Sequence, residues 1–299
     1  MSIKPPEFQG SRKLKLRSGS FLDFSGPALV MAIVNCNDDS FYPPSRALGK
    51  KALEKALAAE KEGAAIVDFG AESTRPGSFY VSCEEELDAL IPVIRAFRER
   101  SSLPVSVDTR KAAVAGAALE AGADIVNDIS ALSDDPDMAK VCAAAGAALA
   151  LMHRKGVPLI MQDAPRYDNL LGELEAYLRA AAEHAIEAGV PAESIIFDPG
   201  IGFGKAKEHN IEILRRMESF TCLPLLAEIC GKDYPVMVGL SRKSFIGEIT
   251  GRLDAGERLP GTLAANGAAI MGGAVIIRVH DVKEHVDLAK MLGALRPEF

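Results

Sequence analysis

Three polar side chains that accept hydrogen bonds stand where apolar stretches of the chain end. They are Asp108, Asn127 and Asp198, and each closes a run rich in Val, Ile or Phe. Two carboxylates and one amide can accept hydrogen bonds from the N–H groups along one edge of a flat heterocycle, such as an aminopyrimidinone. These residues therefore predict a binding site for a small, planar, nitrogen-rich ligand.

A second set of side chains carries positive charge or suits an anion. Lys243 and Arg278 would balance the carboxylates, because burying an unpaired charge is costly. Arg75, Arg278 and His280 offer charge-assisted donors that suit a phosphate group. Asn35 closes the first apolar run and offers an amide oxygen for Mg2+. We expect a site with a heterocycle half and an anion half.

Each of these residues also has an ordinary structural explanation. Asp108 and Asp198 can cap the helix or turn that follows them, and Asn127 can belong to a turn. Lys243 lies in a Ser-Arg-Lys-Ser stretch that suits a solvated loop, and His280 can be a structural histidine. The glycine run after Asp198 lacks the spacing of a Walker loop. What favours a site is the joint placement of these residues at the ends of successive runs.

Eight short apolar runs give the chain a repeating plan, with amphipathic segments rich in Ala, Leu and Glu between several of them. The runs cover residues 28–35, 64–70, 104–109, 123–129, 146–153, 194–200, 235–243 and 273–280. Near-continuous apolar runs suit parallel strands buried on both faces. Eight strand–helix units with right-handed crossovers close into an α/β fold of the (β/α)8 TIM-barrel type. An open, doubly wound sheet is the alternative.

In such a barrel the carboxyl ends of all strands face one rim, where the active sites of this fold lie. The predicted rim contains Asn35, Asp68, Glu72 to Arg75, Asp108, Asn127, Met152, His153, Asp198, Ser241 to Lys243, Arg278 and His280. We expect one barrel domain at 28–299 and a lead-in or hairpin at 1–27 beneath it. The longer loop at 154–172 is a candidate lid.

Composition limits the classes of partner. The chain has 299 residues, 48% hydrophobic, and a formal net charge of -7, which disfavours nucleic acid or an anionic membrane as partner. Five scattered cysteines without a C-x-x-C pair indicate reduced thiols in a cytoplasmic protein. We expect neither a signal peptide nor a membrane span. Small molecules are the expected ligands.

Several segments in combination resemble the dihydropteroate synthase family. They are FGAESTRPGS (69–78), SVDTRKAAVAGAALEAGADIVNDIS (106–130), FDPGIGFGKAKEHN (197–210), VGLSRKSFIG (238–247), ERLPGTLAA (257–265) and IIRVHDV (276–282). The resemblance runs from about residue 28 to the C-terminus. It implies a barrel, usually a homodimer, that acts in folate synthesis. The implied reaction joins (7,8-dihydropterin-6-yl)methyl diphosphate to 4-aminobenzoate with the help of Mg2+. Its products are 7,8-dihydropteroate and pyrophosphate, and sulfonamides mimic the aminobenzoate.

The resemblance also implies roles for residues of this chain. The pterin is expected on Asp108, Asn127, Met152, Asp198 and Lys243. The diphosphate is expected on Asn35, Arg75, Arg278 and His280, with Asn35 also near the metal. The aminobenzoate is expected near Thr74, Pro76, Phe203 and Ser241, beside Lys243. The implied catalytic residues are Asp198, Lys243 and Arg278.

The first loop departs from the family pattern. Asn37 and Asp38 replace a Thr-Pro pair, and Pro43 replaces a second Asp. Loop closure and metal geometry are therefore in question, and a pterin-binding relative without synthase activity is a second hypothesis. A third is a corrinoid methyltransferase domain that binds methyltetrahydrofolate, but that class has no need for the ESTRPGS and RVH segments. We expect Cys36, beside this loop, to be an inert thiol that faces the core.

Overall fold

Parallel strands form a nearly closed barrel in the computed structural model, which describes residues 13–36, 45–72, 80–156, 161, 164–232 and 234–295. The barrel strands are β3 (Leu29–Asn35), β4 (Ile66–Gly70), β5 (Val105–Asp108), β6 (Ile125–Asp128), β7 (Ala148–Met152), β8 (Ile195–Asp198), β9 (Met237–Gly239) and β10 (Ile276–Val279). Their hydrogen-bonded order is β8-β7-β6-β5-β4-β3-β10-β9. A parallel bridge between Phe197 and Val236 joins the two ends of this order. The predicted barrel is confirmed, and the open doubly wound alternative is wrong.

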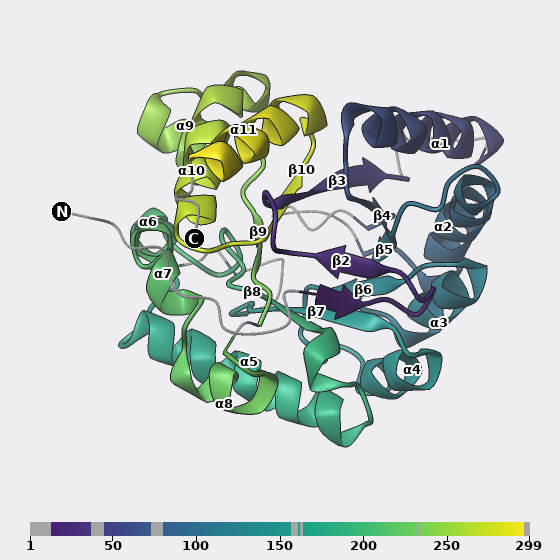
Figure 1. Cartoon of the computed structure of the whole chain (residues 1–299), viewed down its shortest axis with the longest axis horizontal. Coiled ribbons are helices and arrows are strands. Elements are labelled where there is room, and N and C mark those ends of the chain that lie inside the picture. The colour runs from purple at the N-terminus through teal and green to yellow at the C-terminus, as the bar shows by residue number, and fades with distance from the viewer. Residues whose placement is uncertain are drawn as a thin grey trace.

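Helices surround the strands (Figure 1). They are α1 (Ser45–Glu62), α2 (Cys83–Arg98), α3 (Ala112–Ala121), α4 (Met138–Ala145), α5 (Leu170–Glu187), α6 (Lys207–Arg215), α7 (Met217–Phe220), α8 (Pro224–Cys230), α9 (Ser244–Thr250), α10 (Leu259–Met271) and α11 (Val282–Ala294). Short 3-10 turns at Ala192–Ser194 and Ala255–Arg258 precede β8 and α10. Each parallel crossover therefore carries at least one helix on the outside of the barrel.

Local sequence explains where several helices begin and end. The Ser82 hydroxyl caps α2 by accepting from the Glu85 backbone N–H, and the Glu85 carboxylate accepts from the Ser82 backbone N–H, which forms a capping box. Gly122 ends α3 with φ 116°, and Gly146 ends α4 with φ 63°. Glycine adopts this left-handed conformation without the steric cost of a side chain. Glycine therefore ends both of these helices.

Alternation along the strands separates an outer core from the barrel interior. On β4, Val67 and Phe69 pack in the cluster that includes helix residues, whereas Ile66 packs in a second cluster inside the barrel. Because successive side chains point to opposite faces, Asp68 and Gly70 lie on the same inward side as Ile66. The interior therefore has an apolar floor with polar side chains above it.

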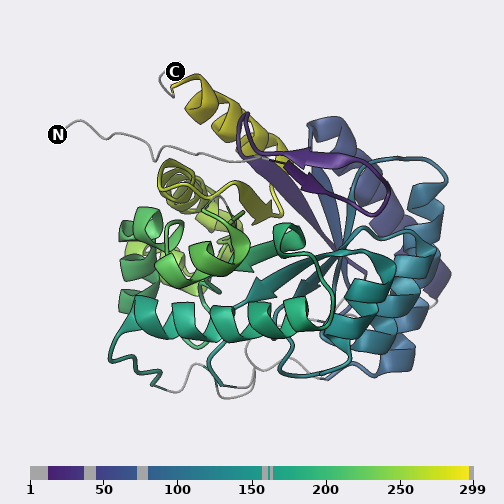
Figure 2. The ribbon, with the colours of Figure 1, turned by 60° about the horizontal axis from the view of Figure 1, so that its bottom comes forward.

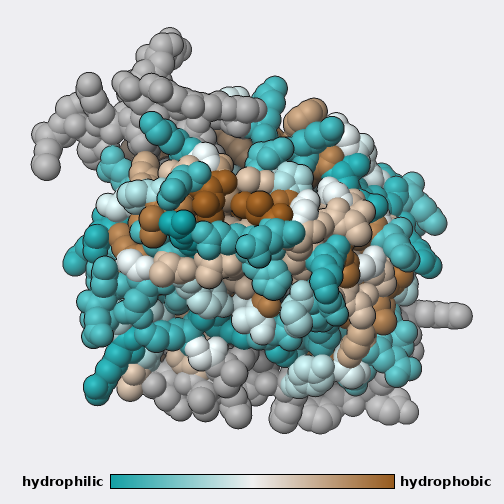
Figure 3. Space-filling model, turned by 90° about the horizontal axis from the view of Figure 1, so that it is seen from below, coloured by the Kyte–Doolittle hydropathy of each residue, from teal (hydrophilic) through white to brown (hydrophobic). Residues whose placement is uncertain are grey.

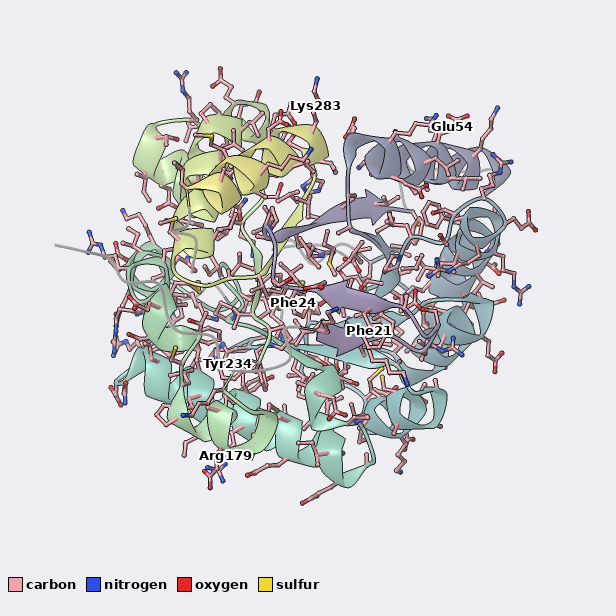
Figure 4. All side chains as sticks on the ribbon, in the orientation of Figure 1. Phe21, Phe24, Glu54, Arg179, Tyr234 and Lys283 are labelled. Atoms are coloured by element: carbon pink, nitrogen blue, oxygen red, sulfur yellow. The ribbon has the colours of Figure 1, made fainter. Side chains whose placement is uncertain are left out.

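A short antiparallel hairpin, β1 (Lys13–Lys15) and β2 (Phe21–Asp23), covers that floor. Leu14, Leu22 and Phe24 pack with Met31 and Ile196 of the barrel strands. Figure 2 shows the hairpin, in dark purple, lying against the parallel strands, and Figure 4 shows Phe24 near the middle of the projected barrel. The division of the chain into a lead-in at 1–27 and a barrel domain at 28–299 stays a prediction.

The outer surface is mainly polar on the face shown in Figure 3, with hydrophobic patches between the hydrophilic side chains. Glu54, Arg179 and Lys283 point outward from their helices (Figure 4). An apolar hollow of about 320 Å3 lies among α6, α9 and α10 and contains none of the predicted site residues. Within the described ranges, no helix combines the length and apolarity needed to cross a membrane.

Candidate active site

The strand ends bring the predicted pterin residues together inside one rim. Strand register pairs Gly70 with Asp108, Asp108 with Asn127, and Met152 with Asp198. All four of the predicted residues in these pairs are buried. Their alternation places them on the inward side of β5, β6, β7 and β8. The polar ring predicted from the sequence is therefore a real feature of the barrel mouth.

Arg278 lies between two carboxylates in this ring. Its Nε donates to Oδ2 of Asp68 at 2.6 Å, and its Nη2 donates to Oδ2 of Asp108 at 2.5 Å. Burial raises the pKa of Asp108 to about 7; Arg278 opposes this rise, and the nearby charge of Asp68 adds to it. Arg278 thus balances buried carboxylates, as the sequence predicts. Its contact with a diphosphate stays a prediction.

Asp198 and Lys243 form a second charged group. Burial raises the pKa of Asp198 and lowers the pKa of Lys243 to about 8, while the charge of each partner opposes the shift of the other. Lys243 Nζ donates to the carbonyl oxygen of Ile201 and lies 4.4 Å from the centre of the Phe203 ring. Lys243 therefore connects the predicted pterin residues to Phe203, a predicted aminobenzoate residue.

Asn127 presents a buried acceptor to the barrel interior. Its Oδ1 is buried and has no hydrogen-bond partner within the described part of the chain. Leaving a buried polar group unpaired costs about 1–3 kcal/mol, so such an atom calls for an explanation. This acceptor is available to a ligand N–H, and Asp108, paired with Asn127 across the sheet, carries further acceptors beside it.

Glycines allow the loop after β8 to pack closely against the loop after β7. The backbone N–H of Gly200 donates to Oδ1 of Asp198 at 2.6 Å. Gly200 has φ +65°, and a Cβ at this position would lie 1.8 Å from the carbonyl oxygen of His153. Only glycine fits such an approach. The loop is therefore held against β7 in a way that places Phe203 at the rim.

Lys205 also holds this loop, a role that was not predicted from the sequence. Its buried Nζ lies 2.8 Å from Nδ1 of His153 and donates to the carbonyl oxygens of Gly200 at 2.9 Å and Phe203 at 3.1 Å. Burial lowers the pKa of His153 to about 2, so the ring is neutral and Nδ1 can accept a hydrogen bond from Nζ of Lys205. Burial also lowers the pKa of Lys205, which the charge of Asp198 opposes. A lysine that closes a glycine run is the only sequence signal of this arrangement.

Ser241 and His280 meet where the loops after β9 and β10 adjoin. Ser241 Oγ lies 2.9 Å from Nδ1 of His280. Beside them, Arg242 donates twice to Asp281, from Nε at 2.9 Å and from Nη2 at 2.5 Å. Arg242 has φ 56°, an uncommon conformation for a residue other than glycine. This ion pair, also missed in the sequence, holds the loop of Lys243 against the loop of His280.

The remaining predicted residues lie at the margin of the described structure. Asn35 is exposed at the end of β3. Burial raises the pKa of the adjacent Cys36 thiol to about 12, which agrees with an inert, buried cysteine. Outside the described residues lie Thr74, Arg75 and Pro76, and the altered first-loop positions Asn37, Asp38 and Pro43.

The loop at 154–172 is described in part. Tyr167 donates from its hydroxyl to the carbonyl oxygen of Gly204 at 2.8 Å, and Lys155 pairs with Glu173 at 2.8 Å. The first contact joins the loop to the glycine loop after β8, and the second joins it to α5. Its action as a lid stays a prediction.

The described ranges contain no group of three or more His, Cys, Asp or Glu residues that could hold a metal ion. Mg2+ commonly keeps several waters and takes few protein oxygens together with substrate phosphates. An exposed amide oxygen at Asn35 fits a metal of that kind, which would be bound jointly with a diphosphate.

Comparison with known proteins agrees with this geometry. Residues 31–280 match the family described as pterin binding enzyme. The chain belongs to the pterin-binding enzyme family. The dihydropteroate synthase of Synechocystis sp. is 42% identical over 277 residues, which cover 92% of this chain and 93% of that protein. The dihydropteroate synthase of Escherichia coli (strain K12) is 41% identical over 277 residues, covering 92% and 94%.

Solved pterin-binding enzymes share the fold. A Xanthomonas albilineans dihydropteroate synthase with 4-aminobenzoic acid superposes with a TM-score of 0.86 at 36% identity, covering 97% of this chain and 100% of that one. The Thermus thermophilus enzyme in complex with 6HMPPP gives a TM-score of 0.79 at 37% identity, covering 95% and 100%. The resemblance to dihydropteroate synthases predicted from the sequence is confirmed.

Proposed function

We propose that the protein catalyses the dihydropteroate synthase reaction. It is a transferase that moves a pterinylmethyl group from (7,8-dihydropterin-6-yl)methyl diphosphate to 4-aminobenzoate. The observation that carries the proposal is the set of acceptors on adjoining strands, Asp108, Asn127 and Asp198, with Lys243 and Arg278 as their counter-charges. The likeness to named dihydropteroate synthases at 41 and 42% identity supports the same activity.

The pterin ring binds deep in the barrel mouth. Its N–H groups donate to Asp108, Asp198 and Asn127, whose Oδ1 then gains a partner. Met152, buried at the end of β7, supplies an apolar contact for the ring. Lys243 lies on the side of the ring from which the second substrate enters.

The diphosphate leaves from the anion half of the site. His280 and Arg278, together with Arg75 and Asn35, hold the phosphate oxygens as the carbon–oxygen bond breaks. Mg2+ held by Asn35 and the substrate would help to neutralise the growing negative charge on the diphosphate. The carbon left behind becomes cationic, and the electron-rich pterin ring delocalises that charge.

The aminobenzoate approaches over Phe203 and Ser241, and the family resemblance also assigns Thr74 and Pro76 to its binding. Its aromatic amine is neutral at pH 7, so it attacks without a strong base. A nitrogen–carbon bond forms, the carbon–oxygen bond to the diphosphate breaks, and the amine loses one proton to solvent. Lys243 Nζ, 4.4 Å from the Phe203 ring centre, borders this subsite. The Xanthomonas structure with 4-aminobenzoic acid supports this choice of second substrate.

Titration calorimetry tests the ligand class. The probes are the pterin diphosphate with Mg2+, the bare pterin (6-hydroxymethyl-7,8-dihydropterin) and methyltetrahydrofolate. We expect the diphosphate to bind at least about tenfold more tightly than the bare pterin, because it adds charge-assisted contacts. Tighter binding of methyltetrahydrofolate contradicts the proposal and favours the methyltransferase hypothesis. Product formation separates an active synthase from a pterin-binding relative without activity.

We further propose a homodimer that acts in the cytoplasm. The dimer is implied by the resemblance to dihydropteroate synthases. The cysteines are all free, and Cys36 and Cys142 are buried, which suits a reducing compartment. Light scattering is expected to give twice the chain mass of 31.8 kDa. A mass of one chain at micromolar concentration would contradict the dimer.

A further inference from the structure

Asp68 is a buried carboxylate to which the proposed function gives no role. It lies on β4, two residues before Gly70, the strand partner of Asp108, and its side chain is fully buried. Oδ2 accepts from Nε of Arg278 at 2.6 Å, whereas Oδ1 has no hydrogen-bond partner among the described residues. In register with Asp68 on β5 is Ser106, also buried, with an unpartnered Oγ. A polar layer therefore lies directly beneath the residues that face the pterin.

The charges in this layer do not balance. Arg278 is one cation, and it contacts two carboxylates, those of Asp68 and Asp108. Lys243, the other predicted counter-charge, interacts with Asp198 and does not act on Asp108. Two buried carboxylates that share one cation cannot both ionise freely. Such a group reaches neutrality by holding a proton.

Other charged groups around Asp108 do not remove the excess. Glu86 of α2 adds negative charge and is paired with Lys111 at 2.7 Å. Asp128 of β6 also adds negative charge, and its oxygens are occupied by Ser130 and Leu132. Asp198 of β8 also adds negative charge, and its attraction helps to raise the pKa of Arg278. Burial, with these carboxylates added, outweighs the attraction of Arg278.

We propose that Asp68 is a positioning residue that fixes the Arg278 guanidinium and competes with Asp108 for its positive charge. Its bond to Nε sets the plane of the guanidinium, so that Nη2 reaches Asp108. The negative charge of Asp68 shares the positive charge of Arg278, which would otherwise stabilise only ionised Asp108. Asp68 therefore changes how readily Asp108 accepts hydrogen bonds from the pterin, without contacting the pterin itself. This role rests on the proposed pterin recognition.

The role predicts a shift in pH dependence. Ionised Asp108 accepts pterin N–H donors, whereas its protonated form binds them less well. The pKa of Asp108 is raised to about 7, so pterin affinity is expected to rise as the pH increases through this value. In Asp68→Asn the negative charge that adds to this rise is lost, so the pKa of Asp108 falls. The rise in affinity then moves to lower pH by about one unit or more.

The experiment measures the affinity of the bare pterin from pH 5 to 9 in the full chain, in Asp68→Asn and in Ser106→Ala. The serine variant is the matched control, because it alters the same buried layer without changing charge. We expect the midpoint of the pH dependence to fall by about one unit in Asp68→Asn and to stay unchanged in Ser106→Ala. An equal midpoint in all three proteins, with or without weaker binding, overturns the proposal. A midpoint that shifts equally in Ser106→Ala also overturns it.

Infrared spectroscopy of the wild-type chain provides a test that needs neither ligand nor a folded Asp68 variant. The infrared band of protonated carboxyl groups is recorded for the wild type and for Asp108→Asn. The variant lacks the Asp108 carboxyl and therefore serves as the blank. We expect a band that disappears near pH 7 in the wild type and is missing in the blank. A carboxyl that is already ionised at pH 5 overturns the proposal. Because no pterin is present, this result stays informative even if the proposed pterin binding fails.

Discussion

Asp198 uses one carboxylate oxygen to hold its own loop and leaves the other for the barrel interior. Oδ1 accepts from the backbone N–H of Gly200 at 2.6 Å, while Lys243 supplies the opposing charge. A cap and a ligand acceptor, which are alternatives when only the sequence is considered, are thus compatible in one side chain. This explains why a buried strand ends in a carboxylate followed by glycines.

Asp198→Asn should weaken pterin binding by about tenfold to a hundredfold, since a hydrogen bond to a charged group is worth about 1.5–3 kcal/mol. The amide keeps the shape of the side chain and one acceptor, so folding should be little affected. Calorimetry with the bare pterin measures the loss, and thermal unfolding checks the fold. Unchanged pterin affinity would remove Asp198 from the site.

His280 belongs to the anion half, so its removal should discriminate between ligands. His280→Ala is expected to weaken the pterin diphosphate by on the order of tenfold and the bare pterin by much less. The same calorimeter compares the two ligands in the wild type and the variant. Equal losses for both would show that His280 supports the site generally, through its contact with Ser241.

At the scale of elements, the loop after β8 shows what sequence can and cannot predict. The buried strand, its polar end and the glycine turn are all visible in the sequence, because burial and backbone geometry leave local patterns. The contacts of Lys205 Nζ are not visible in the sequence, since they depend on His153 in another loop. Asp68 and Arg278 are likewise 210 positions apart, and only the closed barrel brings them together. Polar residues of the rim and the sign of their counter-charges were therefore predictable, but the individual partners were not.

Gly200→Ala should destabilise the loop far more than a glycine substitution at similar φ elsewhere. A Cβ at Gly200 would lie 1.8 Å from a backbone oxygen, so we expect a loss of about 3 kcal/mol or more in the free energy of unfolding. Gly146→Ala is the matched control, because Gly146 has φ +63° and nothing within 4 Å of an added Cβ. It should cost about 1 kcal/mol. Urea unfolding compares the two, and equal costs would contradict the close approach.

At the scale of the whole molecule, the two ends of the barrel differ: one carries the candidate site and the other is closed by the hairpin. The carboxyl ends of the strands carry the polar ring, while the hairpin at Lys13–Asp23 packs on the apolar floor. The barrel could be predicted from eight apolar runs. The hairpin could be expected only as one option for the lead-in, because strands of three residues leave too short an alternation to be recognised.

Phe24→Ala should reduce the free energy of unfolding by about 3–5 kcal/mol, because Phe24 is 7% exposed and packs on the floor. Phe21→Ala makes the same chemical change in the same hairpin, but Phe21 is 55% exposed, so it should cost about 0.5 kcal/mol or less. Figure 4 labels both side chains. Urea unfolding measures both variants, and similar costs would mean that the hairpin does not pack on the barrel.

The most direct test of the central claim is the formation of 7,8-dihydropteroate by the purified full chain. The reaction contains the pterin diphosphate, 4-aminobenzoate and Mg2+, with each omitted in turn, and both dihydropteroate and pyrophosphate are measured. We predict equal amounts of the two products, formed only when both substrates are present. Pterin binding without any dihydropteroate would contradict the claim and identify the chain as a pterin-binding relative that does not catalyse the condensation.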